Sequence, residues 1–189
     1  MRVFIACLIL IFGVTGASVA QPLHYLLDPN RSIVGFELDF GQNLIRGRMP
    51  VSDADLTLDF EQVAASHVRV TLKADAARAD LPFATQAMRG ENVLATRSFP
   101  LIRFESTSVR ASETGAIVSG NITIRDITHP VMLNARIFRA KGTEEGERDN
   151  LAVQLTGTVS RSAFGAVGYA DLVGDEVRLN IVAYIQRKG

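Results

Sequence analysis

One stretch of the sequence reads Ser-Phe-Pro-Leu-Ile-Arg-Phe-Glu-Ser-Thr-Ser-Val, residues 98–109. Pro100 has no N–H and restricts the residue before it, so a helix cannot run through this point. Leu101–Val109 then places Ile, Phe, Thr and Val among Ser and charged residues, which is typical of a β-strand. The stretch therefore predicts where a helical segment, expected over Thr85–Leu94, passes into a β-scaffold.

The side chains of this strand predict which of its faces is buried. Successive residues of a strand point to opposite sides of the sheet. We expect Phe104 to point inward together with Ile102 and Ser106, while Arg103 and Glu105 face the other way. This strand is therefore expected to contribute one face to an apolar interior.

Other segments alternate apolar and polar residues in the same way, which indicates strands with one buried face. Short turns join most of them, so antiparallel pairing is expected. Strands of about nine residues favour a closed barrel over a sandwich, and a barrel of about eight strands is wide enough to hold one small ligand. The predicted strands are Gln21–Leu27, Ser32–Phe40, Leu44–Met49, Asp53–Phe60, His67–Ala74, Leu101–Val109, Ala116–Ile124, His129–Phe138, Leu151–Ser160 and Glu176–Ile185.

Two interruptions of this pattern carry specific predictions. The Ala-rich segment 75–94 predicts one or two short helices, and Thr85 is expected to cap a helix that continues to Leu94. Gly90 weakens that helix, because glycine is a poor helix former. Gly47 inside a predicted strand indicates a bulge or a bend.

The first residues of the chain are expected to be an export signal. Arg2 precedes the apolar run Val3–Val14, and small residues end at Ala20, which is typical of a signal peptide cleaved after that residue. The run is shorter than the roughly 20 residues of a membrane span, so we expect no span in the exported protein. Cleavage would remove Cys7, the only cysteine, so the domain of residues 21–189 would fold without disulfides.

The charge balance excludes one class of partner. The sequence holds 20 Lys and Arg against 20 Asp and Glu, a net charge of +0. Nucleic-acid binding requires a surplus of clustered positive charge, so no nucleic-acid partner is expected.

Small residues share the inward faces of several strands, namely Gly120, Ala135, Gly157 and Ala183. They leave volume that a ligand could fill, since an empty void loses dispersion contacts. They also suit close packing of a helix or an aromatic ring, for which Phe83, Met88 and Phe99 are available. The pattern alone leaves both interpretations open.

Residues that could carry catalysis are scarce. His24, His67 and His129 are far apart in sequence and have no metal-ligand spacing. Asp53 and Asp55 project to the same side of a strand, which suits either an acid–base pair or a solvated face. No G-x-S-x-G elbow, P-loop or dinucleotide-binding motif occurs. The sequence therefore predicts no enzyme and no metal site.

Four segments together resemble the YceI-like family of periplasmic lipid- and polyisoprenoid-binding proteins. They occur in the family's order and extend over residues 22–186. The segments are Tyr25–Asp28 with Ser32–Phe36, then Phe99–Thr107, then Gly120–Ile124 with Ile127–Val131, and finally Ser160–Gly165.

The sequence departs from the family pattern at three places. Arg125-Asp126 stands where the family tends to have a glycine, and Ala163 stands where it has an aspartate. Val93-Leu94-Ala95 replaces a Phe-Phe-Asp near the helix end. The preferred ligand is therefore open, because that helix end is where ligand contact is expected.

The resemblance implies an extended lipocalin-like antiparallel barrel with an apolar central tunnel. It also implies a periplasmic protein that carries a long-chain amphiphile such as a polyisoprenoid, an isoprenoid quinone or a fatty-acid derivative, with no covalent cofactor. The residues expected to line the tunnel and bind the tail are Phe36, Leu38, Phe40, Phe83, Met88, Phe99, Ile102, Phe104, Ile122, Leu133, Val153 and Phe164.

Further expectations concern the polar head and the partners. From their position beside the predicted helix, Arg89 or Arg97 could meet an anionic or carbonyl head at the tunnel mouth. A homodimer is compatible with the sequence. Two other hypotheses stay open: a module whose barrel is filled by its own side chains and which acts through protein partners, and an enzyme acting on a bound lipid.

Overall fold

The computed structural model describes residues 22–139, 142, 144 and 146–189. The predicted signal peptide, residues 1–20, lies outside these residues. The described chain forms one antiparallel sheet of 11 strands and one α-helix, α1, Pro82–Arg89. The strands are β1 Leu23–Leu27, β2 Ile33–Phe40, β3 Asn43–Met49, β4 Val51–Leu58, β5 His67–Lys73, β6 Arg78–Ala79, β7 Leu101–Ser112, β8 Gly115–Ile124, β9 Ile127–Phe138, β10 Asn150–Ser160 and β11 Glu176–Arg187.

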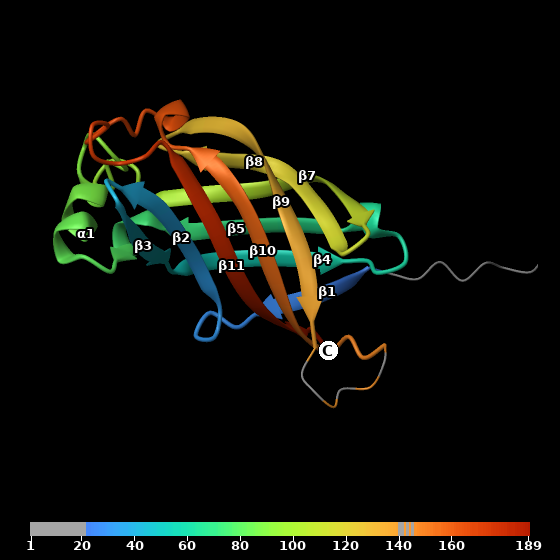
Figure 1. Ribbon diagram of the computed structural model, residues 1–189. Coiled ribbons are helices and arrows are strands. Elements are labelled where there is room, and N and C mark those ends of the chain that lie inside the picture. The colour runs from blue at the N-terminus through green and yellow to red at the C-terminus, as the bar shows by residue number, and fades with distance from the viewer. Residues whose placement is uncertain (1–21, 140–141, 143, 145) are drawn as a thin grey trace, which may run out of the picture.

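Eight of these strands close into a barrel, in the order β1-β4-β5-β7-β8-β9-β10-β11 and back to β1 (Figure 1). Strand β11 pairs with β1 near its C-terminal end and with β2 over Arg178–Val182. Strands β2, β3 and β6 therefore extend the wall at the end where α1 lies. The mainly β fold, the antiparallel pairing and the barrel are confirmed.

Strand β2 shows why the alternating pattern folds this way. Its apolar residues face the interior, and its carboxylates face outward, where Arg178 of β11 binds both of them. The Arg178 Nε donates to Glu37 Oε1 (3.1 Å) and Nη2 donates to Asp39 Oδ1 (2.8 Å). The hydrogen bond from Arg178 lowers the pKa of Asp39. The outer ion pairs thus hold β2 on β11 while the inner face stays apolar.

Strand β7 has the predicted phase in its first half. Ile102 is buried and Phe104 is partly buried, whereas Arg103 and Glu105 are exposed. A bulge follows, because the pairing with β8 shifts between Ser106 and Ser108. The bulge changes which residues face inward, so that Val109 is buried further along the strand.

The predicted helix boundaries are wrong at both ends. Helix α1 begins at Pro82, which suits a first helical turn because the missing N–H would have no partner there. Thr85 is not the cap: it lies inside the helix, and its Oγ1 accepts a hydrogen bond from the Ala79 N–H (2.9 Å). The helix ends at Arg89, before Gly90, and turns replace the predicted segment to Leu94.

The prediction of a bulge or bend at Gly47 is also wrong. Gly47 pairs in regular register with Phe36 of β2 and with Ala79 of β6. A Cβ at Gly47 would collide with the Phe36 ring, so the glycine makes room for that ring. The described bulges lie elsewhere, between Val51 and Asp53 and in β7.

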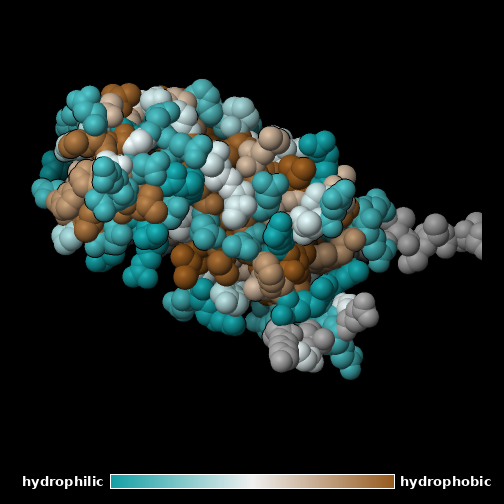
Figure 2. All heavy atoms as spheres, in the orientation of Figure 1, coloured by the Kyte–Doolittle hydropathy of each residue, from teal (hydrophilic) through white to brown (hydrophobic). Residues whose placement is uncertain are grey.

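The outer surface seen in Figure 2 is mixed, and hydrophobic residues reach it at the end that α1 covers. Among the described residues, no helix is long and apolar enough to cross a membrane. The interior of the barrel is where the apolar side chains gather, in two clusters of buried residues. Residues of both clusters line the candidate site.

Candidate functional site

Two apolar cavities occupy the barrel. One has a volume of about 410 Å³ and lies at the α1 end; we call it the lid chamber. The other has a volume of about 440 Å³ and extends toward the opposite end; we call it the far chamber. Each falls in the range of ordinary ligand pockets, roughly 300–1,000 Å³. Two of the four small inward residues, Ala135 and Ala183, line the far chamber. A Cβ at Gly120 would instead meet the Phe104 ring, and one at Gly157 the Leu133 side chain, so these two glycines serve close packing.

The lid chamber collects most of the residues predicted to line a tunnel. Apolar residues of β2 form one wall, α1 covers another, and Phe164 comes from the segment after β10. The predicted residues that line the lid chamber are Phe36, Leu38, Phe40, Phe83, Met88, Ile102, Ile122 and Phe164.

The far chamber is lined by the remaining predicted residues except one. Phe104 of β7, Leu133 of β9 and Val153 of β10 line it, together with Ile102 and Ile122. Phe99 lines neither chamber, so its place in the predicted wall is corrected. It lies in the turn before β7, where its N–H donates to the Ala95 carbonyl (3.0 Å) and the strand has not yet begun.

The lid chamber opens to solvent between α1 and the segment 162–175. Phe83, Tyr169 and Leu172 all line the chamber, and 57%, 57% and 58% of their surfaces are nevertheless exposed. The Phe83 ring lies 6.0 Å, centroid to centroid, from the ring of Phe40 inside. An unbroken apolar path thus leads from the surface into the chamber, and these three residues define its mouth.

Helix α1 is held over the chamber by polar contacts at both ends. Near its start, Thr85 contacts Ala79, the last residue of β6. At its end, Arg89 Nη2 donates to the Ala77 carbonyl (2.7 Å). The face that looks into the chamber carries Ala84, Ala87 and Met88, in line with the helical repeat. These contacts fix the lid without placing a charge in the chamber.

Segment 162–175 forms the other side of the mouth and is organised by Arg161. This arginine is 8% exposed, and its guanidinium is surrounded by backbone carbonyls of the segment. Nε donates to Gly174 (2.9 Å), Nη1 donates to Ala166 and Gly168 (2.5 and 2.7 Å), and Nη2 donates to Val173 (3.0 Å). Arg161 stands in the segment Ser160–Gly165, and its sequence pattern predicts no role for it.

The base of the same segment is fixed by a carboxylate. Asp175 accepts hydrogen bonds from the hydroxyl of Ser160 and from the N–H of Ser162 (2.9 Å). The hydrogen bond from Ser160 is the main reason why the pKa of Asp175 is lowered. Asp175 therefore joins the end of the segment to its start, and Arg161 binds the carbonyls in between.

The polar content of the lid chamber is small. Among the described residues, only Arg161 and Tyr169 bring polar side-chain atoms to its lining. Arg89 and Arg97, the residues expected to meet a polar head, line neither chamber. Arg97 is exposed, and Arg89 lies on the far side of α1 against Ala77. The site is suited to an apolar chain rather than to an ion.

The other titratable candidates do not meet. Asp53 and Asp55 are exposed on β4, and Asp55 forms a solvated ion pair with Arg69 (3.6 Å) rather than an acid–base site with Asp53. His24 and His67 contact neighbouring strands on the outer surface. Within the described ranges, no group of three or more potential metal ligands comes together.

Comparison with solved structures places the fold among similar barrels. The chain is similar to Burkholderia cenocepacia BcnA, with a TM-score of 0.73 at 16% identity over 84% of this chain and 98% of that one. It is also similar to a polyisoprenoid binding domain from Saccharophagus degradans implicated in plant cell wall breakdown, with a TM-score of 0.61 at 13% identity over 88% of this chain and 99% of that one. These likenesses concern the fold.

Sequence relatives agree with this placement. A UPF0312 protein of Photorhabdus laumondii is 27% identical over 125 residues, which cover 65% of this chain and 65% of the relative. A UPF0312 protein of Yersinia pestis is 26% identical over 123 residues, 65% of this chain and 64% of that relative. Residues 25–184, almost the whole described barrel, match the YceI-like domain, and the chain therefore belongs to the YceI-like family.

Proposed function

We propose that this protein binds a long-chain amphiphile, a polyisoprenoid, an isoprenoid quinone or a fatty-acid derivative, with its apolar tail inside the barrel. The observation that carries the proposal is the pair of adjoining chambers, whose linings are almost entirely apolar. Each methylene moved from water into such a space contributes roughly 0.8 kcal/mol. A long tail could therefore bind tightly with no specific polar contact.

The similarity to a polyisoprenoid binding domain supports an isoprenoid as the tail. The polar head would remain at the mouth beside Phe83, Tyr169 and Leu172, because the lid chamber offers few polar partners. The proposed place of action is the periplasm, since residues 1–20 have the composition of an export signal. The proposed role there is to carry or store the lipid.

Binding rather than catalysis suits the lining of the chambers. Arg161 is the one cation that the described residues bring to the lid chamber, and it is already held by four backbone carbonyl contacts. No nucleic-acid partner is proposed, given the balanced charge. A homodimer stays a prediction that depends on measurements in solution. The alternative, a barrel that acts through protein partners without a ligand, is decided by the same experiment as the lipid hypothesis.

Native mass spectrometry of protein purified without detergent tests the proposal. We expect the mass of a bound lipid, or uptake of added ubiquinone or polyprenol by stripped protein, at one molecule per chain. Leu38→Trp, which fills part of the lid chamber, should lower occupancy, whereas Leu26→Trp on the exposed surface should not. A barrel that is repeatedly empty and takes up neither probe would contradict lipid binding and favour the protein-partner alternative.

A further inference from the structure

The two chambers share part of their walls. Five residues line both of them: Val34, Leu72, Ile102, Ile122 and Leu179. They come from five different strands, β2, β5, β7, β8 and β11. Because β11 and β2 pair with each other, and β5, β7 and β8 pair in succession, the five residues project from two separate parts of the wall. We call this set the waist.

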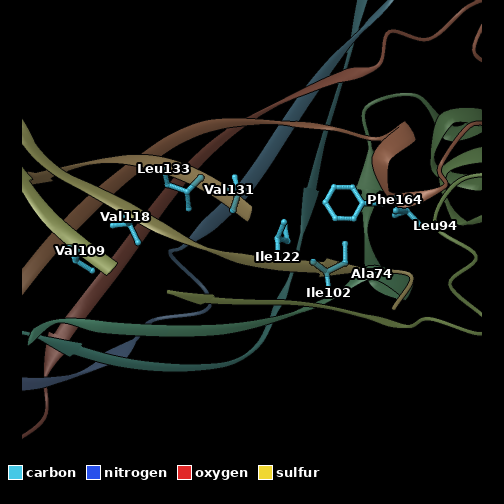
Figure 3. Close-up of a cluster of buried hydrophobic side chains, with 9 residues drawn as sticks. All are labelled: Ala74, Leu94, Ile102, Val109, Val118, Ile122, Val131, Leu133 and Phe164. Atoms are coloured by element: carbon cyan, nitrogen blue, oxygen red, sulfur yellow. The ribbon is translucent and has the colours of Figure 1, made fainter. Parts of the chain in front are cut away.

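The order of residues along the barrel supports this division. Figure 3 shows buried side chains in a row, with Val109 and Val118 at one end, Phe164 and Leu94 at the other, Ile122 between these ends and Ile102 beside Phe164. Val109 and Val118 line the far chamber only, and Phe164 lines the lid chamber only. The waist residues therefore lie where one chamber gives way to the other.

The waist is stiff. Val34, Ile102 and Ile122 are β-branched, so each has few χ1 rotamers available. Ile102 and Ile122 are also buried, on strands whose backbones are hydrogen-bonded to both neighbours. Close-packed interiors resist displacement, so widening the waist would require the wall itself to move. A chain that passes from one chamber to the other must pass between these side chains.

We propose that the waist sets the chain-length selectivity of the protein. Short tails occupy the lid chamber alone, which they reach from the mouth at Phe83, Tyr169 and Leu172. Longer tails thread the waist and gain the far chamber as well. This inference rests on the proposed function and names the residues that would limit the length of the tail.

Three matched Val→Phe substitutions separate the parts of the tunnel. Val34→Phe narrows the waist, Val177→Phe occupies the lid chamber, and Val153→Phe occupies the far chamber. All three valines are partly buried strand residues, and the same substitution adds the same volume at each of them. The probes are prenols of increasing length, from geraniol through farnesol and geranylgeraniol to solanesol. Dissociation constants are measured by native mass spectrometry, with circular dichroism as the check on folding.

For the wild type, we expect the dissociation constant to fall with each added isoprene unit until both chambers are filled. In Val34→Phe, the dissociation constants of short prenols should stay within about twofold of wild type. The gain in affinity with each added isoprene unit should stop once the lid chamber is full. Each methylene kept out of the far chamber then weakens binding by about fourfold, the equivalent of roughly 0.8 kcal/mol. Val177→Phe should weaken every prenol, and Val153→Phe only the longest.

The outcomes that overturn the inference are distinct. Equal weakening of all prenols by Val34→Phe, or unchanged binding of the longest one, would contradict a waist. Weakening of the shortest prenols by Val153→Phe and not by Val177→Phe would contradict filling of the lid chamber first. If Val34→Phe does not fold, Leu179→Phe on the paired strand β11 must show the same break in length dependence, or the inference is wrong.

Failure of the proposed function would look different. Wild-type protein that binds no prenol of any length would contradict lipid binding as a whole. Wild-type protein whose affinity does not rise beyond the shortest prenol would contradict the waist alone and leave lipid binding in place.

Discussion

Individual glycines give aromatic rings room in the barrel wall. Gly120 of β8 is buried, and a Cβ there would lie 2.6 Å from two ring atoms of Phe104. It would also lie 2.5 Å from the carbonyl oxygen of Glu105, which is fixed in the β7 ladder. Such distances are far inside van der Waals contact, so an added methyl group would displace both the ring and the backbone.

We therefore predict that Gly120→Ala destabilises the protein. Overpacking of this kind costs about 1–3 kcal/mol, and the loss of unfolded-state entropy returns at most about 1 kcal/mol. Urea unfolding should show a net loss of about 1–2 kcal/mol. Ser119→Ala, the neighbour on the other face of β8, adds no atom and should change the unfolding free energy by less than about 0.5 kcal/mol. Equal stability of the two variants would contradict the close approach of Phe104.

The turn at Arg125 and Asp126, where this chain departs from the family pattern, has a backbone that favours glycine. Arg125 and Asp126 form the turn between β8 and β9, with φ of 53° and 60°. Two-residue hairpin turns of this hand favour glycine, because other residues are strained at positive φ. The glycine that the family tends to have here thus meets a backbone requirement. In this chain Arg125 stays in the turn and its Nη1 donates to the Val93 carbonyl (3.1 Å), which ties the turn to the lid end.

At the scale of elements, the segment 162–175 depends on one buried cation. Its carbonyls of Ala166, Gly168, Val173 and Gly174 all accept from Arg161. Hydrogen bonds to charged groups are stronger than neutral ones, and a buried guanidinium keeps its charge. The segment carries Phe164 and Leu172 into the chamber lining, so Arg161 shapes the mouth by holding this segment in place.

Arg161→Met is accordingly expected to lower the free energy of unfolding by about 3 kcal/mol, since four carbonyls lose their donor. Hydrogen exchange should rise first at the amides of the segment, before that of the barrel strands. Arg178→Met is the matched control: its ion pairs with Glu37 and Asp39 lie on the outer surface, where solvent weakens them. A larger loss for Arg178→Met than for Arg161→Met would contradict this account.

The elements that could be predicted from the sequence are those whose pattern is local. Alternation along β2 and the first half of β7 gave the strands and their buried faces, because each strand has one apolar side. The helix start could not be predicted from Thr85, since Pro82 is an equally local signal for a first helical turn. The Thr85 hydroxyl accepts a hydrogen bond from the Ala79 N–H instead of capping the helix. The β7 bulge depends on the register with β8, which no local pattern shows.

The same distinction applies to the candidate site. Apolar residues on inward faces, such as Phe36 and Leu133, could be predicted to line a tunnel from periodicity and family resemblance. Phe99 was misplaced because it stands before the strand, where alternation does not apply. The waist could not be predicted, since it arises from strands that are distant in sequence. Arg161 could have been found as a charged residue inside an otherwise apolar motif.

At the scale of the whole molecule, the proposed ligand would link occupancy of the barrel to the stability of the fold. A tail that fills both chambers contacts side chains from most barrel strands and from α1. The unfolded chain has no such cavity, so the proposed ligand would bind the folded state alone and stabilise it by mass action. A ligand that fills the two chambers would therefore add stability that the empty barrel lacks.

We predict that stripped protein melts at a lower temperature than protein saturated with a long prenol. At a free ligand concentration of 100 times Kd, the gain is about 2.7 kcal/mol, and for a domain of this size it corresponds to a rise in Tm of about 5–10 °C. The rise should grow with the logarithm of ligand concentration in differential scanning calorimetry. Leu38→Trp, which fills part of the lid chamber, should reduce the rise, and Leu26→Trp should not. An equal rise in all three proteins would mean that the prenol acts at the surface, and would separate stabilisation from the tunnel.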